Sequence, residues 1–112
     1  MRRIDLTAPQ LQALRSVFAP CADRFDAIGV YGSRATGRAR PGSDVDLVVY
    51  GGRGERLIGE LIGRLEDSDL SIFADVLSYD ALRSDALRAD IDRDTIILFT
   101  AQDLRAAEDV EP

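Results

Sequence analysis

The chain has 112 residues, 46% of them hydrophobic, and a net charge of −6, so its length fits one globular domain. It contains no His and no Lys, and a single cysteine, Cys21, which excludes an internal disulfide and nearly excludes a structural zinc site. Ser-His-Asp catalysis, Walker-type phosphate binding and Schiff-base chemistry are therefore excluded, and any catalysis must use carboxylates, arginines, hydroxyls, backbone amides or bound metal.

The first half of the chain predicts one helix, two strands and a turn between the strands. Thr7 as an N-cap and apolar residues at helical spacing predict a helix that ends before Pro20. Residues 26–31 are typical of a strand, and residues 32–37 (GSRATG) predict a turn that opens a short helix. Residues 45–50 (VDLVVY) predict a second strand.

The second half alternates helices and strands. Residues 57–65 carry an apolar stripe at helical spacing and predict an amphipathic helix. Residues 71–77 predict a third strand, residues 80–92 another helix, and residues 96–99 a short fourth strand.

This order predicts an α/β (α+β) fold in which helices pack on a small mixed sheet of about four strands. We expect residues 1–101 to form one domain. Residues 102–112 form an acidic tail, for which a frayed helix and disorder are both open.

One of the four Asp-x-Asp pairs differs from the others in its surroundings. Asp46 lies inside an apolar strand and Asp44 at its start, whereas the other three pairs fit solvated loops or helix ends. Side chains alternate along a strand, so Val45 and Leu47 face one side and both aspartates the other, about 6.6 Å apart. Two carboxylates placed in this way can hold a pair of divalent cations.

Asp75 is a second acidic residue inside an apolar strand, which is unfavourable without a partner. Metal binding explains it, and an arginine salt bridge on an exposed sheet face is the alternative for Asp75 and for Asp46. Gly32-Ser33 follows the first strand, where glycine lets a phosphate approach the backbone and the hydroxyl adds a donor. Taken alone, Gly-Ser is weak evidence, and an ordinary turn explains it more often than a phosphate site does.

The combination resembles the nucleotidyltransferase superfamily of DNA polymerase beta, and within it the minimal nucleotidyltransferases. The signature of that family is Gly-Ser, ten residues, then Asp-x-Asp, which here is Gly32-Ser33 followed by Asp44-Val45-Asp46. The longer form Gly-Ser-x-Ala-x-Gly fits residues 32–37, and Asp75 matches a third carboxylate on a later strand. The resemblance implies the polymerase beta-like fold and transfer of a nucleoside monophosphate with release of pyrophosphate.

The resemblance also implies roles for residues. Asp44 and Asp46 would hold two Mg²⁺ ions against ATP, the donor, and Asp75 would hold the metal beside the acceptor hydroxyl. Gly32 and Ser33 would cradle the terminal phosphates. Three nearby arginines could neutralise those phosphates or be ordinary surface residues: Arg34, Arg38 and Arg40.

Minimal nucleotidyltransferases are often encoded with a HEPN-domain toxin, and there they act as antitoxins that can adenylylate a tyrosine of the toxin. The resemblance therefore implies a HEPN partner. We expect this partner to supply the acceptor hydroxyl, because no segment beyond the catalytic sheet is left to build an acceptor site. Two alternatives stay open: a homodimer that modifies a small molecule, such as an aminoglycoside, and an antitoxin that acts by contact without catalysis.

The acidic net charge argues against direct binding of nucleic acid. No apolar run approaches the roughly 20 residues that cross a bilayer, and no secretory signal is expected from the first residues. We therefore expect a cytoplasmic protein.

Overall fold

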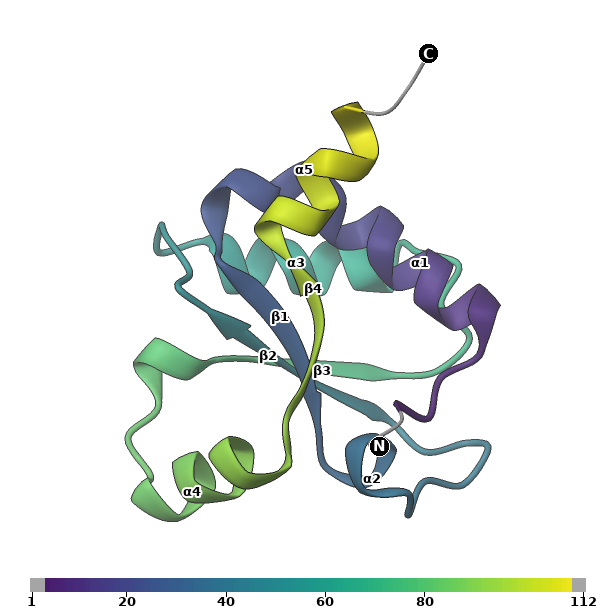
Figure 1. The fold of residues 1–112 in the computed structure, drawn as a ribbon, viewed down its shortest axis with the longest axis vertical. Helices are drawn as coiled ribbons and strands as arrows, with labels where there is room; N and C mark the ends of the chain where they lie inside the picture. The colour runs from purple at the N-terminus through teal and green to yellow at the C-terminus, as the bar shows by residue number, and fades with distance from the viewer. Residues whose placement is uncertain (1–3, 110–112) are drawn as a thin grey trace.

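The fold is one mixed β-sheet with helices packed on it. The computed structural model describes residues 4–109, and Figure 1 shows their arrangement. In chain order the elements of the described part are α1 (Ala8–Phe18), the 3₁₀ helix η1 (Ala19–Arg24), β1 (Ala27–Tyr31), α2 (Ser33–Thr36), β2 (Val45–Tyr50), α3 (Leu57–Glu66), β3 (Ala74–Ser78), the 3₁₀ helix η2 (Tyr79–Ala81), α4 (Asp85–Asp94), β4 (Ile96–Thr100) and α5 (Ala101–Asp109).

The strands lie in the order β3-β2-β1-β4, so β3 and β4 are the two edges of the sheet. Strand β1 is antiparallel to β2 and to β4, whereas β2 and β3 are parallel. A parallel pair needs a crossover between its strands, and α3 supplies it. The predicted mixed sheet of four strands with packed helices is confirmed.

One face of the sheet is covered by α1, α3 and α5, and α4 lies on the other side (Figure 1). The alternation predicted for β2 is confirmed, because Val45 and Leu47 are fully buried in the core beneath the helices. Val48 faces the opposite side and is also fully buried, as is Ile91 of α4. Part of the second face is therefore covered as well.

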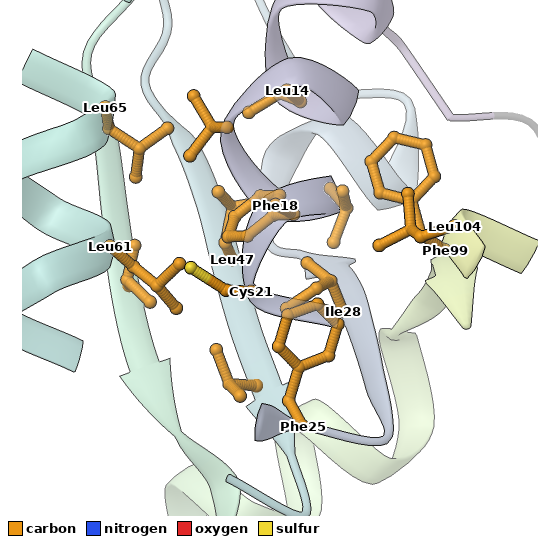
Figure 2. Close-up of a cluster of buried hydrophobic side chains, with 14 of the residues drawn as sticks. Leu14, Phe18, Cys21, Phe25, Ile28, Leu47, Leu61, Leu65, Phe99 and Leu104 are labelled. Carbon is orange, nitrogen blue, oxygen red and sulfur yellow. The ribbon is translucent and has the colours of Figure 1, made fainter. Parts of the chain in front are cut away.

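The hydrophobic core joins the helices to the first face of the sheet, as Figure 2 shows. The Phe18 and Phe25 rings meet edge to face, with 6.2 Å between their centroids. Ile28 and Leu47 from the strands and Leu61 from α3 complete the centre of the cluster. Each such side chain contributes about 1.5–3 kcal/mol by burial, which fixes β1 and β2 under the helices.

Several predicted boundaries agree with the structure, and two differ. Thr7 caps α1 in a reciprocal capping box with Gln10, as its position predicted. The third strand begins at Ala74 and not at residue 71, because the chain first turns back from α3 through the Ser68 hydroxyl, which bonds Leu65 O and Leu70 N.

The helix predicted from residue 80 begins at Asp85. A short η2 turn precedes it, and Leu82 is extended. The Ser84 side chain then caps α4 by accepting a hydrogen bond from Leu87 N at 3.2 Å. The N-cap therefore fixes the start of this helix later than its apolar spacing suggested.

Instead of a frayed or disordered tail, the structure has a helix over Ala101–Asp109, while residues 110–112 lie outside the described part. Thr100 and Asp103 cap its start by exchanging hydrogen bonds of 3.2 and 3.0 Å. Leu104 is fully buried in the core, so α5 packs on the domain. No helix in the described residues is long and apolar enough to span a membrane.

Candidate functional site

A tight turn at the end of β1 carries Gly32 and Ser33. Gly32 has a φ of 73°, a conformation that side chains with a Cβ rarely adopt. A Cβ at this position would lie 2.5 Å from Asp46 Oδ2, so only glycine lets the turn lie against that carboxylate. Ser33 begins α2, and Gly37, with a φ of 79°, is the C-cap of this short helix. The turn and the predicted metal carboxylate are thus direct neighbours.

Asp46 lies at the centre of a row across three strands. In the sheet register its Cα pairs with Asp75 of β3 on one side and with Tyr31 of β1 on the other. Side chains at the same level of neighbouring strands share a face, so all three lie on the face opposite the main core. Asp44 directly precedes β2 and is exposed. The structure therefore brings Asp44, Asp46 and Asp75 to one end of the same sheet face.

The electrostatics of this face reflect crowded negative charge. Burial raises the pKa of Asp46 above its ordinary value, and repulsion from Asp75 and then from Asp44 raises it further. Burial, followed by the charges of Asp46 and Asp75, raises the pKa of Tyr31 to about 12. In the described residues none of the three aspartates forms an ion pair with an arginine, which argues against the salt-bridge alternative.

The donor set of this face fits magnesium. Within residues 4–109 no group of three or more acidic, His or Cys side chains forms a ready-made metal cage. Mg²⁺ seldom uses such a cage, because it is usually bound by one or two carboxylates together with substrate phosphates and waters. Asp46, with Asp44 and Asp75 close enough to affect its pKa, offers the oxygen ligands that Mg²⁺ prefers. The residues therefore fit an open metal site that a nucleotide would complete.

The Arg34 side chain is held inside the protein. It is only 4% exposed. Nε and Nη2 donate to Ser43 O at 3.2 and 2.7 Å, and Nη1 donates to Asp5 O at 2.8 Å. Two longer contacts of 3.5 Å lead to other carbonyls of the loop before β2. The guanidinium is used within the protein, where it holds the residue preceding Asp44, so the expected phosphate contact is not supported.

Two other arginines were considered for the phosphates, Arg38 and Arg40. Both are exposed and lie on the loop between α2 and β2. That loop is shaped by Ser43, whose hydroxyl accepts from Arg40 N at 2.9 Å. The side chains of Arg38 and Arg40 therefore remain accessible to solvent.

Sequence reasoning missed Tyr31. This half-buried residue immediately precedes Gly32 and stands beside Asp46 in the row. Strand alternation alone predicts that Tyr31 lies on the face opposite Val30. That Tyr31 stands beside Asp46 follows only from the register of β1 against β2.

The comparisons with known proteins agree with this geometry. A family model described as polymerase beta, nucleotidyltransferase, matches residues 16–104. No curated protein sequence matches the chain.

Solved structures are similar as well. A structure described as a minimal nucleotidyltransferase has 33% sequence identity and a TM-score of 0.60, with 81% of this chain and 95% of that chain covered. A crystal structure of a toxin–antitoxin with AMP-PNP has a TM-score of 0.64 at 19% identity, covering 86% of this chain and 78% of that chain. A mutant of the toxin–antitoxin MntA-HpeT has a TM-score of 0.57 at 14% identity, with the same two coverages of 86% and 78%.

Proposed function

The chain belongs to the polymerase beta nucleotidyltransferase family, and from this premise we propose that it transfers AMP from ATP to a hydroxyl of a partner protein. The acceptor proposed is a tyrosine of a HEPN-type toxin, which makes this chain the antitoxin of the pair. The observation that carries the proposal is the close packing of the Gly32 turn on Asp46, which itself stands in register with Asp75.

The proposed reaction is an in-line displacement at the α-phosphorus of ATP. The acceptor oxygen forms a new bond to that phosphorus while the bond to the oxygen bridging the α- and β-phosphates breaks. Pyrophosphate leaves with the electron pair, and the hydroxyl proton passes to a carboxylate or to water. Such reactions depend mainly on positioning and charge neutralisation, which suits a site without His or Lys.

Each residue of the site has a defined part in this proposal. Asp44 and Asp46 would hold two Mg²⁺ ions, and Asp75 would hold the one nearer the acceptor. When bound, these ions would neutralise the phosphates and lower the pKa of the acceptor hydroxyl. The turn at Gly32 and Ser33 admits the phosphates close to the backbone. Asp75 stands at the acceptor side and orients the hydroxyl.

Two observations support a protein acceptor. Similar structures include toxin–antitoxin assemblies, one of them with AMP-PNP. The net charge of −6 favours a basic partner, as an RNA-cleaving toxin would be. A reaction that consumes ATP with Mg²⁺ suits the cytoplasm, which is the location we propose.

The test is to incubate the purified chain with ATP, Mg²⁺ and the protein encoded by the gene next to its own, called here the neighbouring gene product, and to measure the intact mass of that product. We expect a mass increase of one or more AMP units, located on a tyrosine by peptide sequencing. Asp46→Asn should abolish the increase, while Asp90→Asn is the matched control because Asp90 is exposed and belongs to an Asp-x-Asp pair on α4. Transfer to a small molecule with no protein modified would contradict the proposal.

A further inference from the structure

A groove beside the proposed site has no assigned role. It has a volume of about 440 Å³ and lies between the C-terminal half of α3, the loop that follows and the outer side of β3. Apolar side chains form most of it, among them Ile62, Leu65 and Leu70. Phe73 also lines it and is 67% exposed, which is unusual for so large an apolar side chain.

Asp75 is part of the wall of this groove. Phe73 O accepts a hydrogen bond of 2.9 Å from Val45 N, so Phe73 continues the β2–β3 ladder just before β3. Residues two apart in a strand share a face, and Phe73 is therefore on the same face as Asp75, one step nearer Asp44. That face is opposite the one that α3 covers, so the groove runs from α3 around the edge strand β3 and reaches the carboxylate face at Asp75.

The position of the groove in the sheet separates it from the donor phosphates. Gly32 follows β1, and β3 lies on the other side of β2 from β1. ATP held at the Gly32 turn would thus approach Asp46 from the β1 side. A molecule in the groove would approach from the β3 side, where Asp75 stands.

We propose that the groove between α3 and β3 binds the segment of the partner protein that carries the acceptor hydroxyl. An apolar or aromatic side chain of that segment packs against Phe73 and Ile62, and this places the neighbouring hydroxyl at Asp75. The proposal rests on the proposed AMP transfer and adds the surface that selects its acceptor.

The charge of the groove defines the chemistry of the occupant. Two acidic residues, Glu66 and Asp75, line it, and no arginine does among the described residues. Asp67 and Asp69, in the turn after α3, follow Glu66 along the chain. A segment with basic residues next to its apolar anchor is complementary to this surface, and opposite charges also speed association.

The experiment compares three exposed apolar residues in turn. Phe73→Asp and Ile62→Asp place a charge in the groove, and Ile97→Asp is the matched control on the opposite edge strand, where Ile97 is 49% exposed. Binding of the neighbouring gene product is measured by titration calorimetry without nucleotide, Mg·ATP affinity is measured separately, and AMP transfer is followed by intact mass. A photocrosslinking p-benzoylphenylalanine in place of Phe73 or Ile97 maps the contact.

We expect both groove variants to weaken partner binding at least about tenfold, with Mg·ATP affinity unchanged and Ile97→Asp behaving as wild type. The crosslink from position 73 should map to a basic, apolar segment next to the modified hydroxyl. Partner binding that is lost in the groove variants without any AMP transfer in the wild type would support the docking surface and refute the transfer.

Four outcomes overturn the inference. Unchanged partner binding and transfer in Phe73→Asp would leave the proposed function intact and remove the docking surface. A loss of Mg·ATP affinity would assign Phe73 to the nucleobase instead. Dissociation of a homodimer by the groove variants would make a second copy of the chain the occupant. Absence of any binding by the neighbouring gene product would refute both the docking surface and the proposed partner.

Discussion

The two sides of strand β2 differ in how completely the chain builds them. On the side of β1, the Gly32 turn packs on Asp46, and the buried Arg34 ties the loop before β2 to the N-terminal segment. On the side of β3, Asp75 is exposed on an edge strand beside Phe73, which is 67% exposed. The side proposed for the donor is therefore fixed by internal hydrogen bonds, whereas the side proposed for the acceptor is an exposed surface on which another molecule could bind.

The largest effect on AMP transfer is expected from neutralising one of the carboxylates proposed to bind metal beside the triphosphate. Asp44→Asn or Asp46→Asn should keep the fold and reduce AMP transfer by about 100-fold or more, because the charge held against the triphosphate is lost. Single-turnover transfer with labelled ATP measures the effect. Full activity in either variant would contradict the assignment of the metal carboxylates.

The Arg34 guanidinium joins the loop before β2 to the N-terminal segment by hydrogen bonds, so its removal should reduce stability strongly. Arg34→Met removes part-buried hydrogen bonds to several carbonyls, including those of Ser43 and Asp5, and should cost about 2–4 kcal/mol in free energy of unfolding. Urea denaturation measures it, with exposed Arg38→Met as the control, expected within about 0.5 kcal/mol of wild type. Equal stabilities of the two variants would show that Arg34 does not brace the loop.

A smaller loss is expected at Gly32. Gly32→Ala forces a residue with a Cβ to a φ of 73° and against Asp46 Oδ2, which should cost about 1–3 kcal/mol of stability. Gly63→Ala is the matched control, because Gly63 lies in α3 and a Cβ there would meet nothing within 4 Å, so alanine should stabilise by about 0.5–1 kcal/mol. Thermal denaturation distinguishes the two, and a neutral Gly32→Ala would contradict the close packing.

The smallest effect expected is a gain in stability. The pKa of Asp46 is raised by burial and by its acidic neighbours, so the ionised form is disfavoured in the folded state. In EDTA at neutral pH, Asp46→Asn should therefore melt at a higher temperature than wild type, because it removes that charge. Adding Mg²⁺ should raise the melting temperature of wild type and leave that of the variant nearly unchanged. A lower melting temperature for the variant in EDTA would contradict the crowded-charge description.

Much of the fold followed from local patterns. The alternation of β2 correctly placed Val45 and Leu47 in the core, and the Thr7 cap correctly placed the start of α1. These features depend only on residues close together in the chain. The start of β3 was placed too early because apolar residues such as Ile72 and Phe73 extend beyond the residues that form the strand.

The arrangement of the site depended on long-range contacts. The pairing of Asp46 with Asp75 and Tyr31 follows from strand order and register, which no local pattern encodes. The contacts of the Arg34 side chain also depend on the fold. An arginine next to a candidate phosphate turn is typical of a phosphate ligand, but the fold brings Ser43 O and Asp5 O to its guanidinium, which is used internally.

We propose that Mg·ATP and the acceptor hydroxyl approach Asp46 from opposite sides of β2. The variant Asp75→Asn tests this arrangement. Mg·ATP affinity and the single-turnover rate of AMP transfer to the partner protein are measured in parallel on wild type and variant. Mg·ATP affinity close to that of wild type, with the transfer rate nearly abolished, is the result expected of an acceptor-side carboxylate. Loss of Mg·ATP binding with an unchanged transfer rate, or no change in either quantity, would contradict the account.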